Sequence, residues 1–270
     1  MRKPAMGKST EKTTERSELP VGVFDSGVGG ISVLREMVAL LPEEDFIFYG
    51  DSANAPYGTK EPEEIRKLTL ASVDHLRQMG IKAVVIACNT ATSAAITTLR
   101  ESYPDMPVIG IEPAVRPAVH PGSFPNVLVM ATPSTVQGEK FSHLAHELEG
   151  EAKIYPLGCP GLMEFVERGE LEGGQVDETL RRLLEPCRDI TFDAVVLGCT
   201  HYPFLKKAIR KALGPAPRIL DGSEGTARQL KRRLQEENLI RKTHRKGTVK
   251  FVMSLPGKEE LCKKLLESRI

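Results

Sequence analysis

The stretch AVVIACNTATS at residues 83–93 and the stretch AVVLGCTHYP at residues 194–203 decide the fold of this chain. Both begin with four apolar residues, which is typical of a short strand buried on both faces. Both continue through a cysteine, Cys88 or Cys199, into small polar residues that can start a helix. The two stretches lie 111 positions apart, and we interpret them as corresponding parts of an internal duplication.

Strand and helix patterns alternate around both stretches. The sequence predicts strands, in two series of three, at VGVF (21–24), DFIFYG (45–50) and AVVIA (83–87), then at NVLVMA (126–131), KIYPLG (153–158) and DAVVLG (193–198). The predicted helices start near residues 30, 61 and 90, pass through His143 and His146, and start again at Leu162 and near Phe204. Repeated strand and helix units of this kind form parallel sheets covered by helices.

The sequence therefore predicts an α/β fold with two similar doubly wound parallel-sheet domains, related by a pseudo-two-fold axis. Residues 21–113 with 224–270 are expected to form the first domain, because a basic helix and the strand KFVMS (250–254) rejoin it, and residues 114–223 the second. Residues 1–20 are polar and aperiodic, and we expect a disordered extension. Ligands of doubly wound sheets bind beyond the carboxyl ends of the strands, so the active site is expected in the cleft between the domains.

Composition excludes several classes of function. The formal net charge is only +1, so no overall field favours nucleic acid or a membrane surface. The chain has no apolar stretch long enough to span a membrane and no signal peptide, so we expect a cytoplasmic protein. Its five cysteines include no Cys-x-x-Cys pair, which argues against disulfides and zinc and predicts free thiols.

Four further features have plainer interpretations. FDSGVGG (24–30) lacks a full dinucleotide or Walker motif, and His143 and His146 have no third ligand in a metal motif. Cys159 ends a strand and is a third candidate thiol, but Pro160 follows it and lacks an N–H. The basic residues between 228 and 246 are expected to form a solvated helix face with acidic neighbours.

A cysteine at the start of a helix lies near backbone N–H groups, which stabilise a thiolate or a substrate carboxylate. Two such cysteines, Cys88 and Cys199, in equivalent positions of facing halves would lie on opposite sides of one small ligand. Racemisation needs that arrangement, because a proton leaves one face of the α-carbon and another arrives on the opposite face. Asp25, after the first strand, and His201 are available as general acid–base helpers.

Six motifs in order then resemble the aspartate/glutamate racemase superfamily, from about Val21 to the end of the chain. They are FDSGVGG (24–30), YGDSANAPYG (49–58), ACNTATS (87–93), GIEPA (110–114), GCP…VE (158–167) and GCTHYP (198–203). THYP in place of a Thr-Glu pair after the second cysteine favours glutamate over aspartate as the substrate.

The resemblance implies a role for each matching residue. Cys88 and Cys199 match the proton-transfer thiols that act on D- and L-glutamate respectively, with Asp25 assisting the first thiol and His201 and Glu167 the second. The implied substrate-binding residues are Asp25, Ser26, Tyr57, Gly58, Asn89, Thr90, Thr132, Thr200 and His201. MATPSTV (130–136) departs from the family pattern, with Ser134 where glycine is usual.

The resemblance also implies a homodimer that uses neither a metal nor pyridoxal phosphate and that supplies D-glutamate for peptidoglycan. The only partner it implies is the small-molecule substrate. Three alternatives remain open from the residues: a racemase for aspartate or another small amino acid, a hydrolase that uses one thiol with His201 as its base, and a catalytically idle binding module.

Overall fold

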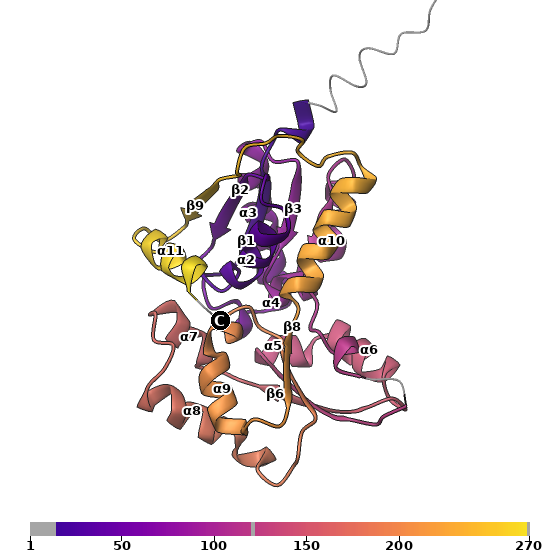
Figure 1. Cartoon of the computed structure of the whole chain (residues 1–270), viewed down its shortest axis with the longest axis vertical. Helices are drawn as coiled ribbons and strands as arrows, with labels where there is room; N and C mark the ends of the chain where they lie inside the picture. The colour runs from indigo at the N-terminus through magenta and orange to yellow at the C-terminus, as the bar shows by residue number, and fades with distance from the viewer. Residues whose placement is uncertain (1–14, 120–121, 269–270) are drawn as a thin grey trace, which may run out of the picture.

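Two parallel sheets, one in each lobe of the molecule, organise the computed structural model, which describes residues 15–119 and 122–268 (Figure 1). The first sheet has the strand order β4-β3-β1-β2-β9 and the second the order β6-β5-β7-β8. The strands of the first are β1 (Val21–Asp25), β2 (Phe46–Gly50), β3 (Ala83–Ile86), β4 (Val108–Gly110) and β9 (Val249–Met253); those of the second are β5 (Asn126–Ala131), β6 (Lys153–Gly158), β7 (Ala194–Leu197) and β8 (Arg218–Asp221). The predicted fold class is confirmed.

The two sheets share one topology. Strands β4-β3-β1-β2 correspond in order to β8-β7-β5-β6, as a duplication of the whole unit requires. The six strands expected from the sequence all form, and each sheet gains one more, β4 or β8, at an edge. These two strands have only three and four residues, too few for a recognisable periodic pattern.

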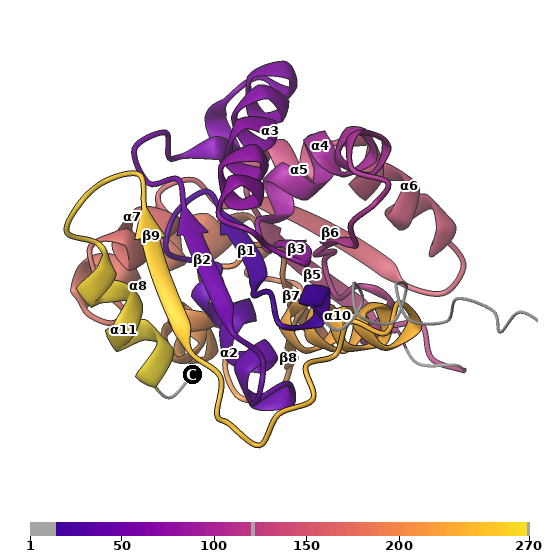
Figure 2. The ribbon, with the colours of Figure 1, turned by 90° about the horizontal axis from the view of Figure 1, so that it is seen from above.

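Helices cover both faces of the first sheet (Figure 2). Helices α3 and α4 lie on one face, and α2, α10 and α11 on the other. Their bounds are α2 (Ile31–Leu40), α3 (Pro62–Gln78), α4 (Asn89–Ser102), α10 (Ser223–Glu236) and α11 (Glu259–Glu267); the second half contains α5 (Pro133–Gln137), α6 (Glu139–Glu147), α7 (Leu162–Glu167), α8 (Gly174–Leu184) and α9 (Lys206–Leu213). Short 3₁₀ turns are η1 (Tyr57–Thr59), η2 (Arg116–Ala118), η3 (Glu185–Cys187) and η4 (Tyr202–Leu205).

The first sheet is discontinuous in sequence. Strand β9 pairs in parallel with β2, with Phe46 opposite Val249, although the whole second sheet lies between them along the chain. Helix α11 then packs against α2 on the same sheet. We propose on this basis that residues 21–113 with 224–270 form one domain and residues 114–223 the other.

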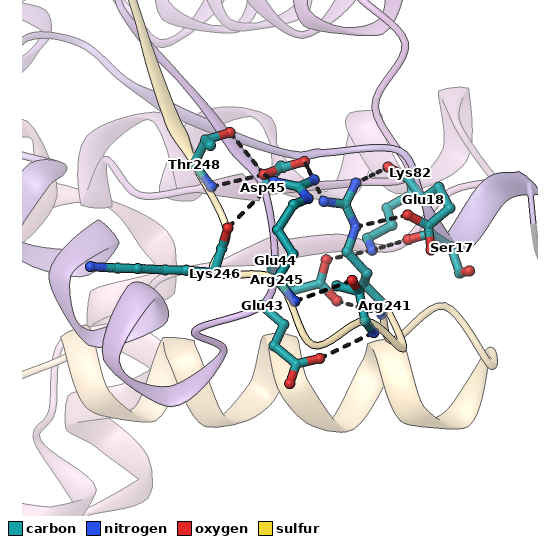
Figure 3. A network of polar contacts seen from close by, with 11 residues as sticks. Ser17, Glu18, Glu43, Glu44, Asp45, Lys82, Arg241, Arg245, Lys246 and Thr248 are labelled. Atoms are coloured by element: carbon teal, nitrogen blue, oxygen red, sulfur yellow. Dashed lines mark hydrogen bonds and ion pairs between the residues drawn. The ribbon is translucent and has the colours of Figure 1, made fainter.

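An ionic network joins the segments that precede β1, β2, β3 and β9, at the amino ends of these strands (Figure 3). Lys82 is fully buried; its ammonium lies 2.5 Å from the Glu44 carboxylate and donates a hydrogen bond of 2.6 Å to the Ser17 carbonyl. The buried Arg241 guanidinium pairs with Asp45, next to Glu44. A buried lysine needs such partners because an unpaired charge is costly inside a protein.

The network corrects the expected extent of the N-terminal extension. Residues 15–20 contact the fold, because the Ser17 carbonyl accepts from Lys82 and the Arg16 guanidinium donates to the Asp105 carbonyl at 2.9 Å. The sequence did not indicate these contacts, because the partner of Ser17 is Lys82, and a lysine is expected at the surface. The remaining residues of the extension, 1–14, lie outside the described part of the chain. Among the residues described, no helix is long and apolar enough to cross a membrane.

Candidate active site

Cys88 follows β3 and caps the N-terminus of α4. Its Sγ accepts a hydrogen bond from the Ala91 N–H at 3.4 Å and lies 3.4 Å from the Ser26 hydroxyl. The residue is only 6% exposed. Burial, followed by the nearby Asp25 carboxylate, raises the pKa of the thiol to about 12, so burial outweighs the helix-start N–H that we expected to favour a thiolate. Cys88 therefore carries its proton at neutral pH.

Cys199 occupies the equivalent place after β7, and a histidine and a carboxylate stand behind it. Its Sγ lies 3.7 Å from His201 Nδ1, and His201 Nε2 lies 2.9 Å from Glu167 Oε1. The same carboxylate oxygen accepts a hydrogen bond of 2.7 Å from the Val28 N–H in the loop after β1. The structure thus brings Cys199 together with His201 and Glu167, the two residues expected to assist it.

The pKa values of Glu167 and His201 are shifted in opposite directions by their contact with each other. Burial alone would raise the pKa of Glu167, but the hydrogen bond and charge of His201, the Val28 N–H and Lys258 lower it to about 2. Burial would lower the pKa of His201, but hydrogen bonds to Cys199 and Glu167 raise it well above its usual value. Both shifts favour a charged pair of His201 and Glu167, with the imidazole ring between the Cys199 sulfur and the carboxylate.

Asp25 lies at the end of β1, fully buried beneath the two thiol sites. Its carboxylate accepts hydrogen bonds from the Gly27 N–H at 3.0 Å and from the Thr200 hydroxyl at 3.1 Å. Burial raises its pKa, against the lowering effect of His201. Among the described residues no hydrogen bond joins Asp25 to Cys88, so its carboxylate reaches that thiol through charge. Asp25 thereby links the two halves through Thr200.

Tyr57 and Gly58 begin the 3₁₀ turn η1 after the loop that follows β2. The Tyr57 hydroxyl donates to the Asp51 carboxylate at 2.7 Å, and burial followed by this bond raises the pKa of Tyr57. A Cβ at Gly58 would lie 2.8 Å from the Thr132 Cβ. Gly58 thus permits the close approach of loops from the two halves, which explains why this turn needs glycine.

Hydroxyl groups join the two halves on the other side of the cavity. Thr90 Oγ1 lies 2.9 Å from Thr132 Oγ1 and 3.1 Å from Thr135 Oγ1. Thr132 also caps α5 by accepting from the Thr135 N–H, with Ser134 3.4 Å away, so the serine that departs from the family pattern is compatible with an ordered turn. The buried Asn89 Oδ1 has no hydrogen-bond partner in the described structure.

These side chains surround one small cavity at the carboxyl ends of the strands. Both thiols face it. Its lining residues are Ser26, Tyr57, Gly58, Cys88, Asn89, Thr90, Thr132, Met163, Cys199, Thr200 and His201. Asp25 and Glu167 lie behind this lining, and only Met163 was not anticipated. Met163 belongs to the apolar α7, so its sequence pattern matched that of a packing residue.

The remaining candidate residues lie outside the cavity lining. The Cys159 thiol donates to the Leu157 carbonyl and lies outside the cavity lining. The described residues contain no group of three or more histidine, cysteine or acidic side chains that could hold a metal ion, and His146 pairs with Glu149 at the surface. The basic residues of helix α10 form ion pairs with acidic neighbours, such as Arg233 with Glu237.

Comparison with known proteins defines the class. Residues 21–230 match the family described as Asp/Glu/Hydantoin racemase. Glutamate racemase of Clostridium perfringens is 50% identical over 250 residues, covering 92% of this chain and 96% of that protein. The chain belongs to the Asp/Glu/Hydantoin racemase family.

Solved structures agree on the fold. Glutamate racemase of Francisella tularensis, in complex with D-glutamate, superimposes with a TM-score of 0.81 at 30% identity, covering 94% of this chain and 95% of that one. Glutamate racemase of Escherichia coli, in complex with L-glutamate and an activator, UDP-MurNAc-ala, gives a TM-score of 0.80 at 32% identity, covering 90% and 92%.

Proposed function

We propose that this protein is a glutamate racemase that interconverts L- and D-glutamate by proton transfer between two thiols, Cys88 and Cys199. The observation that carries the proposal is that both thiols end equivalent strands of duplicated halves and line one small cavity. Relatives that are 50% identical over nearly their whole length carry the name glutamate racemase. Glutamate is bound in two of the related solved structures.

The protonation of the site sets the direction of each transfer. With L-glutamate, a Cys199 thiolate takes the α-proton and becomes a thiol, while the Cys88 thiol gives its proton to the opposite face and becomes a thiolate. His201 lies beside the Cys199 sulfur, and the raised pKa of Cys88 makes that thiol the proton donor when L-glutamate reacts. With D-glutamate the two thiols exchange roles, and proton exchange with solvent resets the pair.

The cavity offers groups for the three charged groups of glutamate, its two carboxylates and its α-ammonium. The start of α4 presents backbone N–H groups next to Asn89 and Thr90, which suit a carboxylate. The unpartnered Asn89 Oδ1 is an acceptor available to the α-ammonium. The hydroxyls of Ser26, Thr132 and Thr200 complete a polar lining that suits the second carboxylate. We propose these residues, with Tyr57, Gly58, Asp25 and His201, as the substrate-binding set.

Exchange in D₂O tests the reaction directly. The purified, pyridoxal-free protein is incubated with L-glutamate in the presence of a chelator, with optical rotation followed by circular dichroism and α-deuterium by NMR. Loss of rotation with deuterium uptake is the expected result. The same measurement with aspartate tests the alternative substrate. Absence of exchange with every acidic amino acid would refute the proposal.

Cysteine variants test the assignment of the two thiols. Cys88→Ala and Cys199→Ala should each lower racemisation by about 10³-fold or more, since each removes one of two essential proton carriers. Cys187→Ala is the matched control, because Cys187 lies in η3, away from the cavity. An active Cys88→Ala protein would support a one-thiol reaction, such as hydrolysis with His201 as the base.

We further infer a cytoplasmic homodimer that supplies D-glutamate for peptidoglycan, on the strength of the family resemblance. Restored growth of a bacterial strain that requires D-glutamate, after expression of this chain, would support the cell-wall role. Sedimentation of the purified protein as a monomer at micromolar concentration would exclude a stable dimer.

A further inference from the structure

Glu167 is bound by both halves of the molecule at once. It lies at the end of α7 in the second half and holds His201 of that half through Oε1. The first half contributes two donors: the Val28 N–H, at 2.7 Å from Oε1, and Lys258, whose ammonium lies 3.3 Å from Oε2. Lys258 also donates a hydrogen bond of 2.6 Å to the Glu167 carbonyl.

The local structure fixes Lys258 in place. The residue is the N-cap of α11, and its carbonyl accepts a hydrogen bond from the Cys262 N–H. Helix α11 follows β9, the edge strand of the first sheet, and packs on α2. The side chain of Lys258 is 23% exposed and that of Glu167 is 12% exposed, so water only partly screens this ion pair. The second half therefore contacts a cation anchored on the C-terminal part of the first.

The contacts of Lys258 give it a means of acting on the reaction without touching the substrate. It is absent from the cavity lining, yet it holds both the carboxylate and the backbone carbonyl of Glu167. Glu167 in turn fixes the ring of His201, whose Nδ1 lies 3.7 Å from the Cys199 sulfur. Among the described residues, the Lys258 ammonium forms hydrogen bonds and ion pairs only with Glu167, and none with a residue beside Cys88.

We propose that Lys258 is a positioning residue for the Cys199 face of the active site: from the first half, it clamps Glu167 and so orients His201 against Cys199 when the two halves are closed. The inference rests on the proposed two-thiol reaction. It goes beyond that reaction by assigning to one thiol a support that crosses between the halves. The lowered pKa of Glu167, to which Lys258 contributes, agrees with a cation held close to the carboxylate.

Lys258→Met removes the cation and keeps an unbranched apolar chain. The expected loss is about tenfold in kcat, the order expected for one charge-assisted hydrogen bond, with KM changed less than about twofold. Lys258→Arg should restore most of the activity, because it keeps a cation at Glu167. Lys263→Met, on an exposed turn of the same helix, is the matched control and should retain full activity.

An isotope effect separates positioning from a general loss of stability. Lys258→Met should slow the Cys199 step in both directions of the reaction. It should therefore increase the α-deuterium isotope effect with L-glutamate, whose α-proton Cys199 removes, and decrease that with D-glutamate, whose α-proton Cys88 removes. Equal isotope effects for both enantiomers, or a Lys258→Met protein as active as Lys263→Met, would overturn the inference. If Lys258→Met does not fold, Lys258→Gln supplies the same measurement, since it also lacks the cation.

The outcomes distinguish this inference from the function on which it rests. A wild-type protein that does not racemise glutamate refutes the proposed function. A wild-type protein that needs both cysteines, combined with a Lys258→Met protein of normal kcat and normal isotope effects, refutes only the role of Lys258.

Discussion

Gly29 offers the sharpest test of how the two halves meet at His201. It lies in the loop between β1 and α2, and its backbone is not in the left-handed region, so alanine is excluded only by space. A Cβ at Gly29 would lie 2.3 Å from His201 Nδ1 and 2.6 Å from the Thr200 hydroxyl oxygen. Non-bonded heavy atoms prefer about 3.5–4.0 Å, so the His201 ring must retreat by about 1 Å.

That displacement fixes the size of the effect. Misplacing a catalytic group by about 1 Å costs on the order of 100-fold in rate, so Gly29→Ala should lower kcat/KM for L-glutamate by about 100-fold. The measurement is the initial rate of change of circular dichroism over a range of L-glutamate concentrations. Urea unfolding of the same preparation checks that the variant is folded.

Gly225→Ala is the matched control. Gly225 lies in α10 with open space around its Cα, so alanine there should leave turnover unchanged and stabilise the helix by about 0.5–1 kcal/mol. If the Gly29→Ala protein keeps more than a third of the wild-type kcat/KM, catalysis does not depend on the observed position of the His201 ring, and the prediction is refuted.

Three further results are expected. Lys82→Met should lower the free energy of unfolding by about 3 kcal/mol in urea titrations, because it leaves the Glu44 carboxylate buried and unpaired, whereas Lys67→Met at an exposed position should change it by less than about 0.5 kcal/mol. Because the pKa of Glu167 is lower in the folded protein than its value of 4.5 in an unfolded chain, ionised Glu167 stabilises the fold by roughly 3 kcal/mol above pH 4.5. This stabilisation should be lost as the pH falls from 4.5 toward 2. The free energy of unfolding of Glu167→Gln should not show this decrease over the same pH range. Cys159→Ala should keep more than half of the wild-type kcat, and a loss like that of Cys199→Ala would make Cys159 a third essential thiol.

Repetition made the fold predictable from the sequence. A strand buried on both faces is a continuous apolar run, and five of the six predicted strands are of this kind, whereas the edge strand β6 is exposed or half-buried along its length. The six runs, in two series, specified both sheets and the strand ends where Cys88 and Cys199 lie. The edge strands β4 and β8 were missed, because three or four residues do not establish a period. The family resemblance, carried by six motifs, also located every lining residue of the cavity except Met163.

Contacts between side chains distant in sequence could not be predicted. Nothing in the residues around Lys258 indicates that its ammonium lies beside Glu167, because that contact depends on how the two halves are packed. Similarly, Lys82 follows a predicted helix and precedes a strand, where a lysine is usually exposed, and only the fold reveals Glu44 and Ser17 around it. Pairings of this kind arise at the tertiary level, beyond the reach of local patterns.

The insertion of the second sheet between β4 and β9 has a consequence for synthesis on the ribosome. Strands β1 to β4 emerge first, but β2 remains an unprotected edge until β9, about 200 residues later, reaches it. The second sheet has all four of its strands by residue 221, so it can complete its hydrogen bonding first. The half that begins the chain is therefore the last to close, and Lys258 reaches Glu167 only at that final step.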